Sequence, residues 1–534
     1  MASKISFAFL LLLLILTLTF LLFRFHSPST LLVFPSTNSS LDSFHRCFRG
    51  HSSPLHDQLP SPIFIAGDAS YHSILLSAVK NPRFLASPAN SKPSLIVAAA
   101  TESHAQAAVV CAGGSGLGIR VLSGGHDYEG MSYSAAGSGA ASFITVDLSG
   151  LRSIAFDADG ASAWVQAGAT LGELYYAVAK QNGSAAFPAG FCPTVGVGGH
   201  FSGGGMGSLT RKFGTAADNI VDARMVDAEG RLLDREAMGE EMFWAIRGAG
   251  SAGFGVIVAF KIAVVRVPPA VTVFNVVRTL RQNATKLAAR WQQLAHRLDR
   301  SLFIRLIAQA ADEPDGTRTI QAIFSSLYLG RREELLAEAG RSIPELSLTA
   351  ADCTEMSWLE SVLFFMGNIS FKAKSDFVKE PIAESGWKEI WKFLMEAAVE
   401  ERLVLIVEPL GGKMSEIQED AIAFPHRKQS LYNIQYFLKW VEKEEEEVTQ
   451  RHLKWMKSLY EFMTPYVSSK PRAAYYNYKD IDLGRNVEGR GSSYLEARVW
   501  GTRYFKGHFL RLAKLKTLVD PQNIFWNELS IPPL

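Results

Sequence analysis

The chain has 534 residues, of which 48% are hydrophobic and 20% are charged, a composition typical of globular proteins. This length predicts two or more domains. The formal net charge is +2, from 54 basic and 52 acidic residues, and this balance gives no electrostatic reason to expect nucleic acid as a partner.

An apolar run covers residues 5–23, between Lys4 and Arg24. This pattern predicts a secretory signal, so residues 1–27 are set apart from the fold. No small-x-small cleavage site follows the run, and the run is nearly long enough to span a bilayer, so an uncleaved signal anchor is the alternative. Only such an anchor would attach the protein to a membrane. In both cases the body of the protein enters the secretory pathway.

The sequence after residue 90 alternates between strand and helix patterns. Residues 94–100 predict a buried strand, and Ser103 and Gln106 then form a capping-box pattern at the start of a helix that ends near Ala112. Residues 119–122 predict the next strand. These short intervals favour an α+β or α/β fold.

A second helix start follows a predicted strand at residues 163–169. Thr170 and Glu173 form its capping box. The apolar residues that share one face of this helix are Leu171, Leu174, Tyr175 and Val178.

Residues 123–130 (SGGHDYEG) form a glycine-rich turn with a potential nucleophile. Ser123, Gly124 and Gly125 can place consecutive main-chain N–H groups against a phosphate. His126 follows directly, although a single histidine taken alone is more often a structural residue. The turn therefore predicts a ligand site only in combination with other features.

Residues 190–200 (GFCPTVGVGGH) form a second such turn. A thiolate is a competent nucleophile, and Cys192 lies just before residues 196–207, in which seven of twelve residues are glycine. So many glycines suit a close approach of the main chain to a ligand. Cys192 taken alone could equally be a buried thiol.

Residues 248–253 (GAGSAG) formally match the dinucleotide-binding pattern G-x-G-x-x-G. That motif requires a strand before it and a helix after it. Here strand-like sequence follows at residues 254–265, so we interpret the segment as a glycine turn and do not expect nicotinamide binding.

From about residue 268 the pattern changes. The apolar alternation at residues 271–277 indicates strands, with amphipathic helices between them. Residues 441–463 predict a long helix, and the acidic run 444–447 within it indicates a solvated face.

The chain has too few cysteines for a disulfide scaffold, and they are Cys47, Cys111, Cys192 and Cys353. Potential glycosylation sites agree with a secretory route, and they are Asn38, Asn182, Asn283 and Asn368. We predict no metal site.

Together, residues 123–130 and 190–200 resemble the flavin-attachment motifs of the berberine bridge enzyme-like family of plant flavoproteins. In that family such a histidine and such a cysteine both bond covalently to one FAD. Further matching stretches, among them residues 424–427 (FPHR) and 432–436 (YNIQY), extend the resemblance over residues 44–534. These motifs are specific for the family and not for its substrate.

The resemblance implies an α+β fold with a two-part PCMH-type FAD-binding domain. Its first part would cover residues 44–267, and residues 473–534 would return to it. Residues 268–472 would form a substrate domain, an antiparallel sheet backed by helices. The resemblance also implies a disulfide between Cys47 and Cys111, which leaves Cys353 as a buried free thiol.

The implied cofactor is FAD, bonded through both His126 and Cys192. The residues implied to surround it are Ser123, Gly124, Gly125, Gly196, Gly198, Gly199 and His200.

The implied catalytic region contains Gln435, at the position where relatives have a glutamate base or a glutamine, and Tyr478, which matches an active-site tyrosine. Tyr128 is a second polar contact. An amide cannot act as a base, and a tyrosine with an ordinary pKa near ~10 needs a nearby cation to ionise. Several relatives have a lysine where this chain has Asn433, and many have a tyrosine where it has Met206.

The resemblance implies hydride transfer from a small substrate to FAD, with O2 then reduced to H2O2. A small residue at the position of Val195 favours oxidase over dehydrogenase behaviour in the family. We expect a secreted or cell-wall oxidase of a carbohydrate or another alcohol. The alternatives are oxidation of a specialised metabolite (a monolignol, alkaloid or cannabinoid-like compound) in the vacuole, endoplasmic reticulum or wall, and a flavoprotein or glycan-binding protein without turnover. The sequence predicts no oligomeric state.

Overall fold

The computed structural model describes residues 37–51, 62–81, 83–86, 90–136, 142–366, 372–396, 403–438, 446–486 and 493–534. Four features predicted from the sequence lie wholly or partly outside this description: the apolar run 5–23, the side chain of Asn38, Asn368, and residues 441–445 at the start of the predicted long helix. Asn182 and Asn283 are exposed, as a glycosylation site requires.

A four-stranded sheet begins the fold, and in spatial order it comprises β1 (Ile63–Ile65), β3 (Leu95–Ala98), β6 (Phe143–Asp147) and β4 (Gly118–Leu122). The last three strands are parallel, and β1 is antiparallel to β3. The predicted strands at 94–100 and 119–122 are β3 and β4. Parallel strands need a crossover connection, and helix α5 (Glu102–Gly114) connects β3 to β4, which lie on either side of β6.

The start of α5 corrects one prediction. Its N-cap is Thr101, whose hydroxyl accepts a hydrogen bond from the main-chain N–H of His104, so the helix begins before the predicted Ser103 capping box. Helix α2 (Thr37–His51) packs on α5, and the predicted Cys47–Cys111 disulfide joins the two helices.

A second sheet is antiparallel, with the order β11 (Leu232–Leu233), β10 (Ile220–Val226), β12 (Val256–Ala263), β8 (Ser162–Gln166) and β7 (Ile154–Phe156). Helix α6 (Leu171–Gln181) begins with the predicted capping box of Thr170 and Glu173. Its predicted apolar face is buried, so this stretch follows the amphipathic pattern of the sequence.

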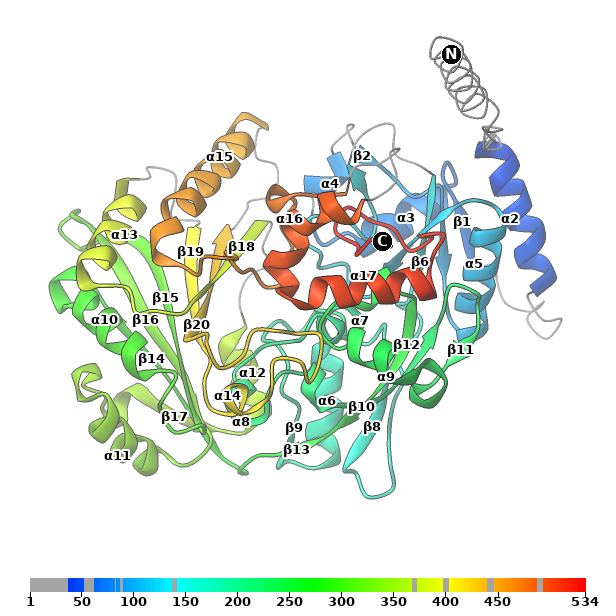
Figure 1. Ribbon diagram of the computed structural model, residues 1–534. Helices are drawn as coiled ribbons and strands as arrows, with labels where there is room; N and C mark the ends of the chain where they lie inside the picture. Colours follow the sequence, from blue (N-terminus) through cyan, green and yellow to red (C-terminus); the bar gives the residue numbers. More distant parts are fainter. Residues whose placement is uncertain are drawn as a thin grey trace, which may run out of the picture.

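A third sheet is antiparallel, with the order β17 (Cys353–Met356), β14 (Val271–Arg278), β16 (Arg318–Tyr328), β15 (Leu302–Asp312), β19 (Leu403–Pro409), β20 (Tyr432–Leu438) and β18 (Lys372–Val378). Its outer face is covered by α10 (Ala284–Leu294), α13 (Glu384–Glu396) and α15 (Glu446–Phe462) (Figure 1). The predicted sheet backed by helices is therefore present, and Cys353 is a buried free thiol.

The C-terminal helices α16 (Tyr494–Phe505) and α17 (His508–Val519) leave this sheet and lie among the N-terminal elements, where red and blue segments meet in Figure 1. The main-chain N–H of Ile119 in β4 donates to the oxygen of Ile524 at 2.8 Å. Arg120 and Glu528 form a buried ion pair at 3.0 Å. These contacts join the two ends of the chain into one body.

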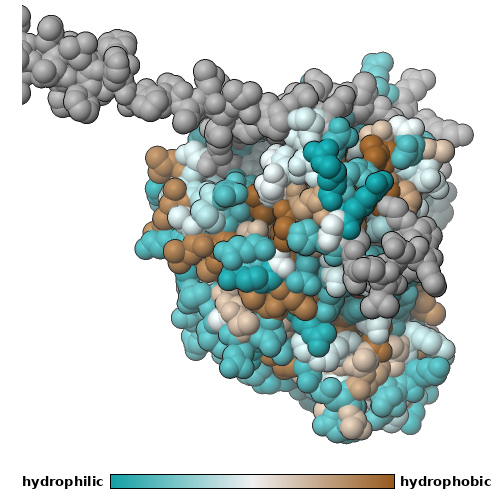
Figure 2. Space-filling model, turned by 90° about the vertical axis from the view of Figure 1, so that its right-hand side faces the viewer, coloured by the Kyte–Doolittle hydropathy of each residue, from teal (hydrophilic) through white to brown (hydrophobic). Residues whose placement is uncertain are grey.

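The remaining helices are α3 (Ala69–Ala78), α4 (Arg83–Ala86), α7 (Val197–Ser202), α8 (Thr210–Phe213), α9 (Arg235–Ala245), α11 (Arg332–Ser342), α12 (Trp358–Phe365) and α14 (Lys413–Glu416). The short strands β2 (Asn90–Ser91) and β5 (Ala135–Ala136) pair with each other, as do β9 (Ala185–Ala186) and β13 (Val265–Arg266). Figure 2 shows that hydrophilic residues cover much of one face, with smaller apolar areas between them. Within the described ranges no helix has the length and apolar character needed to cross a membrane.

Candidate functional site

A cavity of about 400 Å³ lies between the glycine-rich turns and the seven-stranded sheet. We call the wall formed by residues 123–128 and 190–200 the turn side. The opposite wall, which we call the sheet side, is lined by Arg305, Ile307, Val404, Ile406, Glu408, Gln435 and Phe437. Residues 475–479 close the cavity between these two walls.

On the turn side the two glycine-rich turns pack main chain against main chain. A Cβ atom on Gly124 would lie 2.2 Å from the main-chain nitrogen of Gly196, and one on Gly196 would lie 2.3 Å from that of Gly124. Gly125 has φ +70° and lies against the carbonyl of Ala78. Only glycine fits these positions, because each lies against the main chain of another segment. The predicted approach of the main chain to a ligand stays a prediction.

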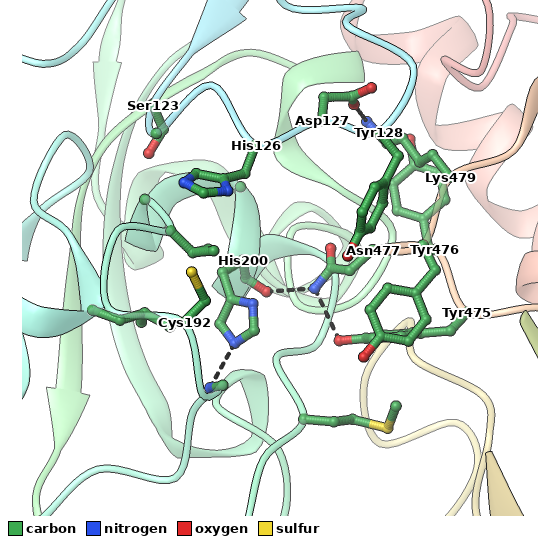
Figure 3. A pocket seen from close by; sticks show the side chains of 18 of the residues that line it. Ser123, His126, Asp127, Tyr128, Cys192, His200, Tyr475, Tyr476, Asn477 and Lys479 are labelled. Atoms are coloured by element: carbon green, nitrogen blue, oxygen red, sulfur yellow. Dashed lines mark hydrogen bonds and ion pairs between the residues drawn. The ribbon is translucent and has the colours of Figure 1, made fainter. Parts of the chain in front are cut away.

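The two potential nucleophiles meet at one residue that the sequence did not single out. The Thr194 hydroxyl lies 3.0 Å from His126 Nε2 and 3.4 Å from Cys192 Sγ. Cys192 is a half-buried free thiol. Figure 3 shows His126 and Cys192 on the same side of the cavity. Both side chains can therefore reach one ligand.

Burial keeps the histidines of this wall neutral. Desolvation, helped by the positive charge of Lys80, lowers the pKa of His126 to about 4. Desolvation also lowers the pKa of His200 to about 4, and the Nε2 of His200 accepts a hydrogen bond from the main-chain N–H of Gly190 at 2.9 Å. At neutral pH the His126 ring thus has an unprotonated nitrogen, which a nucleophile requires.

The sheet side arises from strand alternation. Successive side chains of a strand point to opposite faces, so every second residue of β15, β19 and β20 faces the cavity. The register pairs Ile406 with Gln435. The Gln435 amide donates to the Tyr128 hydroxyl at 3.0 Å, which joins the sheet side to the first turn.

Tyr478 lies between the two walls. Its ring packs edge-on against Tyr128 and Tyr475, with centroid distances of 6.0 and 4.9 Å. Burial raises its pKa well above the ordinary value, and the Glu408 charge adds to this rise while Arg305 opposes it. In this cavity Tyr478 is therefore a neutral phenol at neutral pH.

The 475–479 segment is tied to both glycine-rich turns (Figure 3). The Asn477 amide donates to the His200 carbonyl and to the Tyr475 hydroxyl, each at 2.9 Å. Lys479 forms an ion pair with Asp127 at 3.1 Å. The segment is far away in sequence, but these bonds hold it against the turns.

All the positions predicted to form the site line this cavity, including Val195 and Met206. Asn433 does not line it. The Asn433 amide donates to the main-chain oxygen of Asp376 on β18 at 2.9 Å. Asn433 therefore supplies no positive charge to the cavity.

Sequence reasoning missed Thr194, Arg305 and Glu408. Thr194 lies inside a motif that was already singled out, so its hydroxyl was a visible signal. Arg305 and Glu408 occupy alternate positions of two strands that are distant in sequence. Their single charges within apolar strands were a weaker signal.

The GAGSAG segment follows a helix, α9, and precedes a strand, β12. This order is the reverse of a dinucleotide-binding turn. Gly250 has φ +78° and lines the cavity with the two residues after it. The segment is a glycine turn, as its sequence context predicted.

A family model described as FAD binding domain matches residues 93–235, and one described as Berberine and berberine like matches residues 474–532. Tetrahydroberberine oxidase of Berberis wilsoniae is 44% identical over 519 residues, which cover 93% of this chain and 95% of that protein. Berberine bridge enzyme-like 18 of Arabidopsis thaliana is 44% identical over 531 residues, which cover 95% and 96%. Among solved structures, wild-type Phl p 4.0202, described as a glucose dehydrogenase, is similar with a TM-score of 0.84 and 40% identity, covering 92% of this chain and 99% of that one.

Proposed function

The chain belongs to the berberine bridge enzyme-like family of FAD-linked oxidoreductases, and from this premise we propose that it oxidises a carbohydrate or another alcohol with FAD bonded to both His126 and Cys192. O2 would be the second substrate and H2O2 the second product. The domain limits implied by the sequence, at residues 267 and 472, belong to the same proposal.

The residues of the turn side fit such a cofactor. A side chain at Gly199 would meet no atom within 4 Å, so the main chain there is open to the cavity. The neutral imidazole of His126 and the thiol of Cys192 lie beside this open main chain. Bound FAD supplies the electron acceptor, and the protein supplies its position and surroundings.

One observation carries the proposal: His126 and Cys192 both contact the Thr194 hydroxyl on one wall of a cavity whose other wall is a sheet face with both polar and apolar side chains. Two nucleophiles from separate turns that converge on one point are suited to hold one cofactor from two sides. Gln435, Tyr128 and Tyr478 then surround the place of a substrate. Amide and hydroxyl groups of this kind suit recognition of substrate hydroxyls.

Val195 lies on the cavity wall beside Cys192, and its small side chain supports access of O2. The alternative of specialised-metabolite oxidation is supported by the 44% identical relative called tetrahydroberberine oxidase. Gln435 counts against C–C ring closure of an alkaloid, because an amide cannot accept the proton. Binding without turnover is the third alternative, motivated by Met206 and Asn433.

We further propose a secreted or cell-wall location, which rests on the apolar run 5–23 and on exposed glycosylation sites at Asn182 and Asn283. Vacuole, endoplasmic reticulum and a signal anchor are the alternatives.

The first experiment is acid precipitation of the purified protein, followed by absorbance of pellet and supernatant. Flavin should stay with the pellet in the wild type and in each single variant, H126A and C192A, and should be released only from the double variant. A screen for H2O2 release with D-glucose, cellobiose, benzyl alcohol and tetrahydroberberine follows. Release of flavin from the wild type would contradict covalent attachment, and a response to tetrahydroberberine alone would contradict alcohol oxidation.

A further inference from the structure

Two opposite charges face each other on the sheet side of the cavity. Leu306 of β15 pairs with Val407 of β19, so Arg305 and Glu408 are the next neighbours on the two strands. Arg305 is 8% exposed and Glu408 is 7% exposed, and both line the cavity. Burial lowers the pKa of Arg305 and raises the pKa of Glu408, and the charge of each residue opposes the shift of the other, although the two side chains form no ion-pair contact.

Neither charge is neutralised by a direct contact. Among the residues that the structure describes, none forms a hydrogen bond or an ion pair with the side chain of Arg305 or of Glu408, and Arg305 Nε is buried without a partner. The guanidinium instead lies over the rings of Phe191 and Phe365, at 4.5 and 5.0 Å from their centroids. Unpaired buried charges are costly, so their retention at a ligand cavity points to a role with the ligand.

The other polar groups of the cavity are poorly suited to accept a proton. Burial lowers the pKa of both His126 and His200 to about 4, so these imidazoles are weak proton acceptors. Gln435 is an amide, and Tyr478 is a buried phenol whose pKa is raised. The other cavity-lining carboxylate among the described residues is Asp127, which is paired with Lys479 and accepts main-chain hydrogen bonds from Glu129 and Met131. Glu408 is therefore the cavity carboxylate with free acceptor capacity.

We propose that Glu408 is the catalytic base that takes the hydroxyl proton of the substrate, and that Arg305 is a positioning residue that keeps the Glu408 carboxylate charged. This assignment rests on the proposed alcohol oxidation. It gives the proton a destination that neither Gln435 nor Asn433 supplies. Burial raises the pKa of Glu408 while Arg305 limits the rise, and a base with a pKa closer to neutral is the more effective acceptor.

The hydroxyl proton passes to a Glu408 oxygen, and the electron pair of the broken O–H bond becomes the second bond of the new C=O group. The hydrogen on the same carbon leaves with its bonding pair to the bound flavin, so the substrate is oxidised by two electrons. O2 would then take up these two electrons together with two protons, one from Glu408 and one from the hydrogen that left the substrate carbon, to form H2O2.

The test is the rate of flavin reduction under anaerobic conditions by D-glucose, cellobiose and benzyl alcohol, each from pH 5 to 9. In the wild type the rate should rise with pH through the titration of one carboxyl group and then level off. E408Q should reduce flavin about 10²–10⁴-fold more slowly and should lose this rise. E408D should keep the rise at a lower rate, and Y478F should keep it as well.

Two controls distinguish loss of the catalytic base from damage to the fold or to the flavin site. Addition of sulfite to the flavin needs no substrate proton, so its affinity should be the same in E408Q and in the wild type. Glu416→Gln removes the same charge from an exposed residue after β19, where Glu416 pairs with Arg300, and should reduce flavin at the wild-type rate.

The outcomes are distinguishable. A wild type that none of the three alcohols reduces would overturn the proposed function and the Glu408 assignment with it. A reducible wild type with an unchanged pH profile in E408Q would overturn the Glu408 assignment alone, as would loss of the rise in Y478F. If E408Q bound no flavin, E408D and Y478F would decide, because retention of the rise in both supports Glu408.

Discussion

Main chain packs against main chain on the turn side of the cavity, whereas only side chains reach the cavity from the sheet side. At Gly124 and Gly196 a single added carbon would collide with the facing turn. At Ile406, Gln435 and Phe437 the strands stay in register whatever the side chain is, because strand pairing uses main-chain hydrogen bonds. The turn side is therefore suited to hold one constant ligand, and the sheet side can vary to select among substrates.

Buried ion pairs outside the cavity join the first glycine-rich turn to β18, an edge strand of the seven-stranded sheet. Lys372 on β18 contacts Glu129, which follows Tyr128 in the first turn, and contacts Asp480 at 2.9 Å. Burial alone would lower the pKa of Lys372, but the nearby carboxylates of Asp480 and Glu129 raise it above its ordinary value. Charges outside the cavity thus help to hold the first turn against the seven-stranded sheet.

The largest expected effect comes from Gly124→Ala. The new Cβ would lie 2.2 Å from the Gly196 nitrogen, so the two turns must separate. We expect loss of bound flavin and a destabilisation at or above the ~1–3 kcal/mol usual for overpacking. Absorbance of the purified protein and denaturant unfolding measure the two effects. Gly113→Ala is the control, because nothing lies within 4 Å of its new Cβ in helix α5.

The second largest effect is expected from removing the ion pairs of Lys372. Lys372→Met removes one cation from Glu129 and Asp480, which keep Arg83 and Lys374 as partners, so it should cost about 1–3 kcal/mol of unfolding free energy. The exposed pair Lys392–Glu396 offers a matched control, and Lys392→Met should cost less than about 1 kcal/mol. Equal costs for the two variants would show that the buried pairs do not join the sides.

The pH dependence of the unfolding free energy should report on the turn side, where His200 is buried. The pKa of His200 is about 4 in the fold, below its ordinary 6.5, so between these values the unfolded chain binds one more proton. His200 therefore lowers stability as pH falls from 6.5 to 4, by up to about 3 kcal/mol. His200→Asn should show a decline smaller by that amount in unfolding experiments at each pH. Replacement of the exposed His72 should leave the full decline in place.

The smallest expected effect is on the sheet side. Phe437→Leu changes a cavity-lining side chain without touching the turns. Flavin content should equal that of the wild type, stability should change by about 1 kcal/mol, and KM for the best alcohol should change up to about tenfold. Loss of flavin from this variant would contradict the division of roles between the two sides.

Much of the fold followed from local sequence patterns. The capping box of Thr170 and Glu173 sets the start of α6, because these side chains bond main-chain groups only three residues away. The start of α5 was misplaced because both Thr101 and Ser103 can cap a helix, and the choice of Thr101 is visible only in its bond to the His104 N–H. The predicted alternation at residues 271–277 became β14, although its partners β16 and β17 could not be read from it.

The sequence by itself determined the two glycine-rich turns and their nucleophiles, because glycine spacing and residue type act within a few residues. The tertiary structure alone decided that Gly124 meets Gly196, that Gln435 reaches Tyr128, and that Arg305 faces Glu408. These pairings join segments far apart in the chain, so strand register and the packing of one turn on another decide them. A pattern along the chain shows which groups are present, and only packing shows which of them share a cavity.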